Sequence, residues 1–215
     1  MEKAASKELN QDVSKPDHIR WHLIGHLQTN KCKQIARIPN LALVESVDSI
    51  KLATELNKAC VSVGRATRLP VLIQVNTSGE ASKYGCQPNE ALELFGHVVE
   101  NCPQLKAQGL MTIGRLADTP QPDCFQLLEK IKEEIFEAFK GKTDKHAANS
   151  SSSASSPTPL VVDGDTFDMS MGMSGDYDVG IEYGATIVRI GSSIFGAREY
   201  PERPDTPEAN SNQKE

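Results

Sequence analysis

The residues with the clearest chemical potential lie near the end of the chain, in the stretch GATIVRIGSSIFGAR at 184–198. Residues 185–190 are apolar and mostly β-branched, which predicts a buried strand that carries one charged side chain, Arg189. Gly191 and Ser192 follow, and they predict a tight turn whose backbone N–H groups are open to a ligand. Such a turn suits a phosphate. The same residues also fit a capped turn that holds no ligand.

Arg189 is the second chemical group in this stretch. An arginine inside an apolar strand costs free energy unless its charge is paired. A salt bridge to a neighbouring carboxylate would satisfy it. The alternative is a hydrogen bond to a ligand whose phosphate lies at Gly191 and Ser192, a spacing that suits a phosphorylated aromatic ring. A second strand end at 169–176, MSMGMSGD, could close on the same phosphate.

Other polar residues are weaker candidates. His22 and His26 could bind a metal ion, but no third ligand has matching spacing, so we expect local hydrogen bonds and no metal site. Asp163 and Asp165 could line a cation loop, although we expect them to be solvated. The loop at 76–85 follows the carboxyl end of a strand, where α/β folds bind ligands, but it equally fits a capped polar loop.

Composition excludes several classes of protein. The chain has 215 residues and a net charge of −6, which argues against nucleic acid as a partner. We find no run of 18 apolar residues and no apolar signal core near the start, so we expect neither a membrane span nor secretion. The 5 cysteines are scattered and lack metal-ligand spacing. They are typical of reduced, buried thiols. We expect a cytoplasmic protein, since no targeting segment is seen, and a mitochondrial pool stays open as an alternative.

The elements that must position these residues alternate in type along the chain. We expect strands that alternate six times with helices, and this pattern predicts parallel strands with crossover helices. It fits either an open doubly wound sheet or part of a (β/α)8 barrel. The predicted strands are 19–25, 41–45, 70–76, 105–113, 168–171 and 185–190, and the predicted helices are 26–35, 47–60, 88–101, 124–139 and 176–183.

Two segments fall outside this alternation. Residues 140–159 include a serine-rich run that is too polar to offset its ordering entropy, so we expect a disordered insertion there. The tail at 201–215 has a similar composition. The chain is therefore expected to form a single domain over residues 1–200, followed by a disordered tail.

Several motifs resemble those of the pyridoxal phosphate homeostasis proteins, which share the barrel fold of the alanine racemase N-terminal domain. These are WHLIGHLQTNK at 21–31, VNTSGEASKYG at 75–85, GLMTIG at 109–114, MSMGMSGDYDVGIEYG at 169–184 and VRIGSSIFGAR at 188–198. The resemblance runs from residue 19 to residue 198, apart from the serine-rich insertion. It implies an α/β fold of the TIM type, a (β/α)8 barrel that binds pyridoxal 5′-phosphate (PLP).

The resemblance also implies roles for individual residues and for the whole protein. Arg189 would face the pyridine nitrogen of PLP, and Ser174, Gly191 and Ser192 would hold its phosphate. No catalytic residue is implied, because the family has no established turnover and serves the intracellular homeostasis of PLP, or vitamin B6. An arginine stays charged and should leave the ring nitrogen unprotonated, which argues against an aminotransferase.

The chain departs from the family pattern at its beginning. The family's first strand carries the lysine that forms the Schiff base, and this chain begins after the second strand. We therefore expect a shortened barrel with about six βα units and no covalent attachment of PLP, with Lys31 and Lys83 as weak substitutes. Two other functions stay open: a PLP enzyme similar to an amino-acid racemase, and a truncated isoform that binds no PLP and acts as an interaction module. The oligomeric state does not follow from the sequence.

Overall fold

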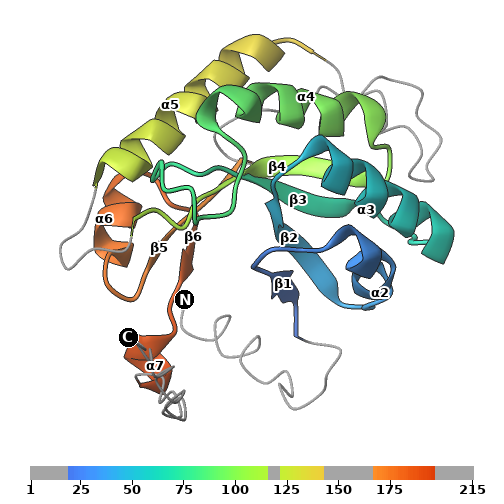
Figure 1. Cartoon of the computed structure of the whole chain (residues 1–215), viewed down its shortest axis with the longest axis horizontal. Coiled ribbons are helices and arrows are strands. Elements are labelled where there is room, and N and C mark those ends of the chain that lie inside the picture. Colours follow the sequence, from blue (N-terminus) through green and yellow to red (C-terminus); the bar gives the residue numbers. More distant parts are fainter. Residues whose placement is uncertain (1–18, 116–121, 143–166, 197–215) are drawn as a thin grey trace, which may run out of the picture.

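Strands and helices alternate along the chain in the computed structural model, which describes residues 19–115, 122–142 and 167–196 (Figure 1). This alternation confirms the prediction of about six βα units. The strands are β1 (Trp21–Leu23), β2 (Leu41–Val47), β3 (Leu69–Gln74), β4 (Leu105–Met111), β5 (Asp168–Met173) and β6 (Ile187–Arg189). The helices and 3₁₀ turns are η2 (Thr29–Lys31), α2 (Cys32–Ala36), α3 (Ile50–Val63), η3 (Pro88–Glu90), α4 (Ala91–Asn101), α5 (Pro122–Phe139), α6 (Tyr177–Glu182) and α7 (Ser192–Phe195).

The six strands form one sheet in the order β1-β2-β3-β4-β5-β6. Each neighbouring pair is parallel. The sheet curves, and α3, α4 and α5 cover its outer face (Figure 1). A doubly wound sheet would reverse its strand order at a switch point. The observed order does not reverse, so the fold is a half-barrel of the TIM type.

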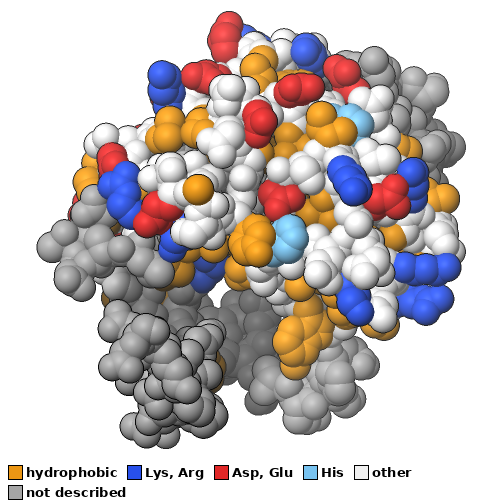
Figure 2. All heavy atoms as spheres, in the orientation of Figure 1, with side chains coloured by type: hydrophobic (Ala, Val, Ile, Leu, Met, Phe, Trp, Pro, Cys, Tyr) orange, Lys and Arg blue, Asp and Glu red, His pale blue; other side chains and the backbone are white. Residues whose placement is uncertain are grey.

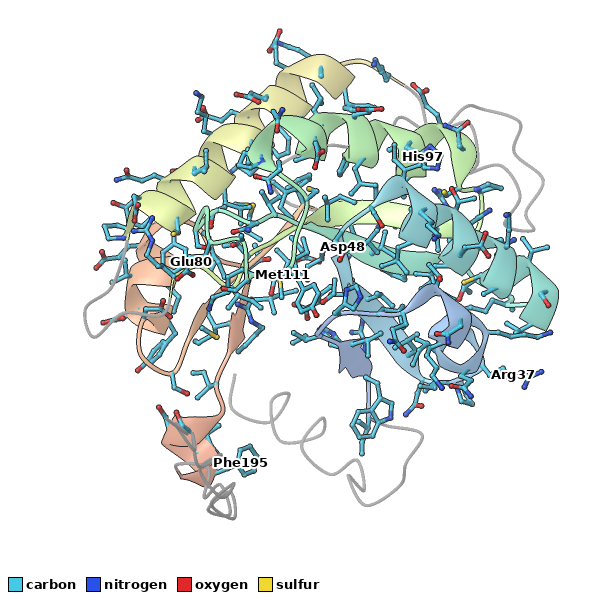
Figure 3. The ribbon with its side chains drawn as sticks, in the orientation of Figure 1. Arg37, Asp48, Glu80, His97, Met111 and Phe195 are labelled. Atoms are coloured by element: carbon cyan, nitrogen blue, oxygen red, sulfur yellow. The ribbon has the colours of Figure 1, made fainter. Side chains whose placement is uncertain are left out.

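The sheet packs on both of its faces. The larger core lies between the sheet and the outer helices and includes Val71, Leu56 and Phe95. A smaller inner cluster lies on the concave face, where Leu43, Leu72 and Met111 pack with Ile113 and Ile187. The label of Met111 in Figure 3 marks this concave side. Burial on both faces explains why these strands read as continuous apolar runs.

Local sequence signals set the ends of α3. The side chain of Ser49 accepts a hydrogen bond from the backbone N–H of Leu52 at 3.3 Å and so caps the first turn. Gly64 adopts φ 68° and ends the helix in the left-handed conformation that glycine tolerates best. β2 continues to Val47, and α3 therefore begins later than the sequence predicts.

The two outermost strands and the first helix are shorter than expected. β1 covers only Trp21–Leu23 of the predicted 19–25, and β6 covers only Ile187–Arg189 of the predicted 185–190. In the described part of the chain each of these strands pairs with one neighbour, so fewer ladder hydrogen bonds extend it. Ahead of α2, the chain does not turn helical at residue 26 but at Thr29, in a 3₁₀ turn.

The described surface carries charges of both signs. Figure 2 shows acidic and basic side chains interspersed over the visible face. Larger apolar side chains are exposed near the two ends of the sheet, where Trp21 is 50% exposed and Phe195 is 85% exposed. None of the described helices has the length and apolar character needed to cross a membrane. The predicted insertion at 140–159 lies mostly outside the described residues, as does the tail at 201–215.

All five cysteines are buried free thiols, as predicted. Burial raises the pKa of the Cys32, Cys60 and Cys102 thiols to about 11, and that of Cys86 to about 12. At pH 8 a thiol with a pKa near 11 is ionised in only about one molecule in a thousand. These thiols are therefore both shielded and weakly nucleophilic.

We predict that iodoacetamide at pH 8 modifies the native chain slowly, because both burial and the raised pKa values suppress the thiolate. Intact-mass spectrometry should show most molecules unmodified after an hour, and five modifications after the same treatment in denaturant. Rapid modification of two or more thiols in the native chain would contradict the described packing.

Candidate functional site

The turns after β5 and β6 meet at one hydroxyl group. The backbone N–H of Gly191 donates to the Oγ of Ser174 at 3.1 Å, and the N–H of Ser193 donates to the same oxygen at 3.3 Å. Ser192 lies between these two N–H groups and begins α7. The structure therefore brings together Ser174, Gly191 and Ser192, the three residues that the family resemblance assigns to phosphate.

Gly191 faces open space. A Cβ placed on it would meet no atom within 4 Å, and its φ of −120° is one that any residue can adopt. Gly191 and the first turn of α7 are exposed. Two N–H groups and a hydroxyl thus converge beside a space that a side chain at residue 191 would fill.

Arg189 reaches away from this turn into the concave face of the sheet. Its Nη1 donates to the Oγ of Ser170 at 2.7 Å, and its Nη2 donates to the backbone oxygen of Thr112 at 2.7 Å. Burial lowers the pKa of the guanidinium, and the negative charges of Glu45 and Asp176 raise it in part. Among the described residues Arg189 forms no direct salt bridge, so the simple ion pair considered from the sequence is not what satisfies it.

Glu45 supplies the opposite charge through an intermediate hydroxyl. The Oγ of Ser170 donates to one carboxylate oxygen of Glu45 at 2.5 Å. The Nδ1 of His22 lies 2.8 Å from the other oxygen. This ring nitrogen and the carboxylate oxygen are within hydrogen-bond distance of each other. We call His22, Glu45, Ser170 and Arg189 the interior network.

The interior network spans the half-barrel. Its members come from β1, β2, β5 and β6, so it connects the two outermost described strands across the concave face. Glu45 is 1% exposed and Ser170 is fully buried. Leaving a buried polar group without its hydrogen-bond partner typically costs about 1–3 kcal/mol, and more for a charged group. The network is therefore expected to constrain the shape of the sheet and the direction of Arg189.

The two histidines lie in different surroundings within the described part of the chain. His22 contacts Glu45, whereas His26 stacks on Tyr84 with ring centroids 4.3 Å apart and has its Nδ1 3.3 Å from an oxygen of Asp48. The described residues contain no group of three His, Cys, Asp or Glu side chains arranged to hold a metal ion. Asp163 and Asp165 lie outside the described residues.

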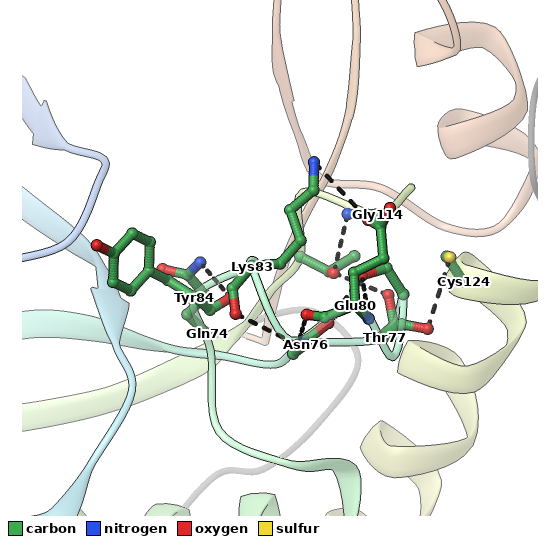
Figure 4. Close-up of polar contacts among 10 residues, drawn as sticks. Gln74, Asn76, Thr77, Glu80, Lys83, Tyr84, Gly114 and Cys124 are labelled. Carbon is green, nitrogen blue, oxygen red and sulfur yellow. Dashed lines mark hydrogen bonds and ion pairs between the residues drawn. The ribbon is translucent and has the colours of Figure 1, made fainter. Parts of the chain in front are cut away.

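The loop at 76–85 is held by its own polar side chains (Figure 4). The amide nitrogen of Asn76 donates to the backbone oxygens of Glu80, at 2.9 Å, and Lys83, at 3.3 Å. Gln74 donates to the backbone oxygen of Tyr84 at 3.0 Å. Of the two possibilities that the sequence left open for this loop, these contacts support the capped polar loop.

Thr112 joins this loop to the interior network. Its hydroxyl donates to the backbone oxygen of Val75 at 3.0 Å and lies 2.9 Å from the hydroxyl of Thr77, while its backbone oxygen accepts from Arg189. The hydroxyl also accepts from the N–H of Gly114 at 3.2 Å. The backbone oxygen of Thr112, which accepts from Arg189, is thus held in place by the hydrogen bonds of the Thr112 hydroxyl.

Glu45, Ser170 and Thr112 were not among the predicted site residues. One signal was available for Glu45, a carboxylate inside the apolar strand sequence LALVESV, and it parallels the signal that drew attention to Arg189. No comparable signal marks Ser170 or Thr112. Their part in the site depends on strand register. Ser170 pairs with Met111, so its side chain shares the concave face with that of Met111, and Thr112 is the next residue after Met111.

Comparison with known proteins gives consistent matches. Residues 18–199 match the family model "Alanine racemase, N-terminal domain". The chain is 39% identical over 213 residues to the pyridoxal phosphate homeostasis protein of Bos taurus, an alignment that covers 97% of this chain and 69% of the relative. A second relative of the same name, from Homo sapiens, is 39% identical over 208 residues, covering 95% of this chain and 66% of the relative.

Solved structures show the same fold. PipY of Synechococcus elongatus with PLP bound is 23% identical and has a TM-score of 0.62, with 91% of this chain and 76% of PipY covered. The chain spans about two thirds of the length of the curated relatives named above. These matches, together with the parallel half-barrel, show that the chain belongs to the alanine racemase N-terminal domain family and, within it, to the pyridoxal phosphate homeostasis proteins.

Proposed function

We propose that this chain binds PLP reversibly and takes part in the intracellular homeostasis of PLP without catalytic turnover. The observation that carries the proposal is that the N–H groups of Gly191 and Ser193 both donate to Ser174. Gly191 lies two residues beyond Arg189, whose side chain is half-buried. The names of its relatives and the PLP bound to PipY support the same ligand.

The residues at the turn fit a phosphate. The N–H groups of Gly191 and Ser193 are donors that suit an anion, and the hydroxyl of Ser174 can donate to a phosphate oxygen. The absence of a side chain at Gly191 leaves the adjacent space open. In this proposal, Ser174, Gly191 and Ser192 bind the phosphate and so fix one end of the ligand.

Arg189 fits the ring nitrogen at the other end. The described contacts use one N–H on each terminal nitrogen, and a guanidinium carries five N–H donors in all. Burial lowers the pKa of Arg189, but an arginine remains cationic in proteins. Arg189 can therefore donate to the ring nitrogen and keep it unprotonated.

This arrangement disfavours one kind of PLP enzyme, an aminotransferase. PLP supplies an aldehyde that condenses with amines and a ring that withdraws electrons, most strongly when the ring nitrogen is protonated. A guanidinium at that nitrogen leaves it unprotonated, which disfavours transamination. We propose a binding protein first and keep the amino-acid racemase as the alternative. A racemisation assay separates these two, and a PLP titration separates both from an interaction module that binds no PLP.

Covalent attachment is not expected from the described lysines. Lys106 is the one lysine of the described strands, and it is exposed near the amino end of β4. The phosphate turn follows the carboxyl ends of β5 and β6. Lys83 pairs with Glu80, with Nζ and Oε2 3.9 Å apart, and Lys31 ends a 3₁₀ turn. None of these three amines is held on a strand beside Arg189.

We predict that Gly191→Val weakens PLP binding more than about a hundredfold, because the side chain fills the phosphate space and displaces at least two charge-assisted hydrogen bonds. Gly191→Ala should have a smaller effect. Fluorescence titration with PLP measures the affinity, and thermal melting checks that both variants stay folded. Equal affinity in wild type and Gly191→Val would place the phosphate elsewhere.

We also predict that borohydride treatment of the chain with PLP gives only trace, scattered labelling, since no described lysine is fixed at the site. Peptide mapping by mass spectrometry locates any modified lysine. Lys83→Arg and Lys31→Arg serve as matched controls that keep the charge. A single stoichiometric adduct would contradict the prediction of reversible binding and identify the lysine responsible.

A further inference from the structure

The direction of the Arg189 side chain is set by two acceptors from different strands. Ser170 lies on β5 and Thr112 follows β4, and they accept from Nη1 and Nη2 respectively. A guanidinium is planar and its donors have fixed directions. Two acceptors on different nitrogens therefore fix the plane of the group as well as its position.

The acceptor on Ser170 has a fixed direction only because of Glu45. A hydroxyl can rotate, so alone it could donate or accept toward several neighbours. The Ser170 hydroxyl donates a hydrogen bond to the carboxylate of Glu45, with the two oxygens 2.5 Å apart, and this leaves the hydroxyl lone pairs for Arg189. Glu45 thus acts on Arg189 without touching it.

The carboxylate of Glu45 has a second partner, His22, at its other oxygen. His22 on β1 contacts the second oxygen of Glu45 at 2.8 Å, with its own side chain 34% exposed. Asp176, in the turn before α6, adds a negative charge that acts on Arg189. Glu45, His22 and Asp176 are thus the titratable groups that bear on the position and charge of Arg189.

We propose that Glu45 is a positioning residue for the PLP site, which orders the Ser170 hydroxyl so that the Arg189 guanidinium is held in place to meet the ring nitrogen of the ligand. This inference rests on the proposed function. It assigns a role to a side chain that neither contacts the phosphate turn nor lies on the same strands.

The first experiment needs no ligand. In the full chain labelled with ¹⁵N-arginine, NMR should show slow rotation of the Arg189 guanidinium, and Arg189→Lys identifies its signals. Ser170→Ala and Glu45→Gln should each speed this rotation at least severalfold, whereas Glu55→Gln, a matched change at an exposed carboxylate on α3, should not. Rapid rotation in wild type, or no change in either variant, would overturn the proposal.

The second experiment reads the ring of the ligand. PLP labelled with ¹⁵N at the ring nitrogen should show a shifted signal when bound to wild type, and a signal closer to free PLP when bound to Ser170→Ala or Glu45→Gln. Affinity should fall on the order of tenfold in each, as expected when one hydrogen bond to a charged group is lost. A purely structural role would lower the melting temperature and leave the bound ring signal unchanged, and that result would overturn the proposal.

The double variant supplies an independent check. Because Glu45 and Ser170 act as one unit, Glu45→Gln with Ser170→Ala should weaken PLP binding no more than Ser170→Ala alone. Additive losses would show that the two residues act separately and overturn the proposal. If wild type fails to bind PLP, the proposed function is wrong, while the rotation measurement still decides whether Glu45 positions Arg189.

Discussion

A buried carboxylate lies on the concave face of this half-barrel, and its charge must be compensated there. Glu45 is 1% exposed on the concave face, and a charge in that position must be compensated. His22 and Ser170 provide the direct contacts, and Arg189 provides the opposite charge one hydroxyl away. These partners lie on β1, β5 and β6. The hydrogen bonds that compensate the charge of Glu45 therefore connect the two outermost described strands across the concave face.

The position of the site follows from this arrangement. The apolar cluster of Leu43, Leu72 and Met111 fills the concave face, and Glu45 and Arg189 lie two residues further along their strands than Leu43 and Ile187. The polar groups therefore gather nearer to the carboxyl ends, where barrels of this type bind ligands. Gly191 follows Arg189 by two residues, and two residues of extended chain advance about 6–7 Å. The backbone therefore sets the separation between Arg189 and the Gly191 turn.

Much of this could be predicted from the sequence, because the relevant signals are local. Alternation of apolar runs and helical patterns predicted parallel strands with crossover helices, and the glycine-serine order after Arg189 predicted the turn. The choice of a barrel over a doubly wound sheet came from the family resemblance. The interior network could not be predicted, because strands buried on both faces lack the alternation that would show which side chains point inward. The true lengths of β1 and β6 were missed for a related reason, since strand ends depend on pairing with neighbours.

A crystal structure of the chain with PLP would show whether one ligand joins the Gly191 turn to the arginine ordered by Glu45. We expect the phosphate against the N–H groups of Gly191 and Ser193 and the Ser174 hydroxyl. The ring nitrogen should lie at Arg189, and the hydrogen bond from Arg189 to Ser170 should be retained. A phosphate bound elsewhere, or a ring nitrogen turned away from Arg189, would contradict this arrangement.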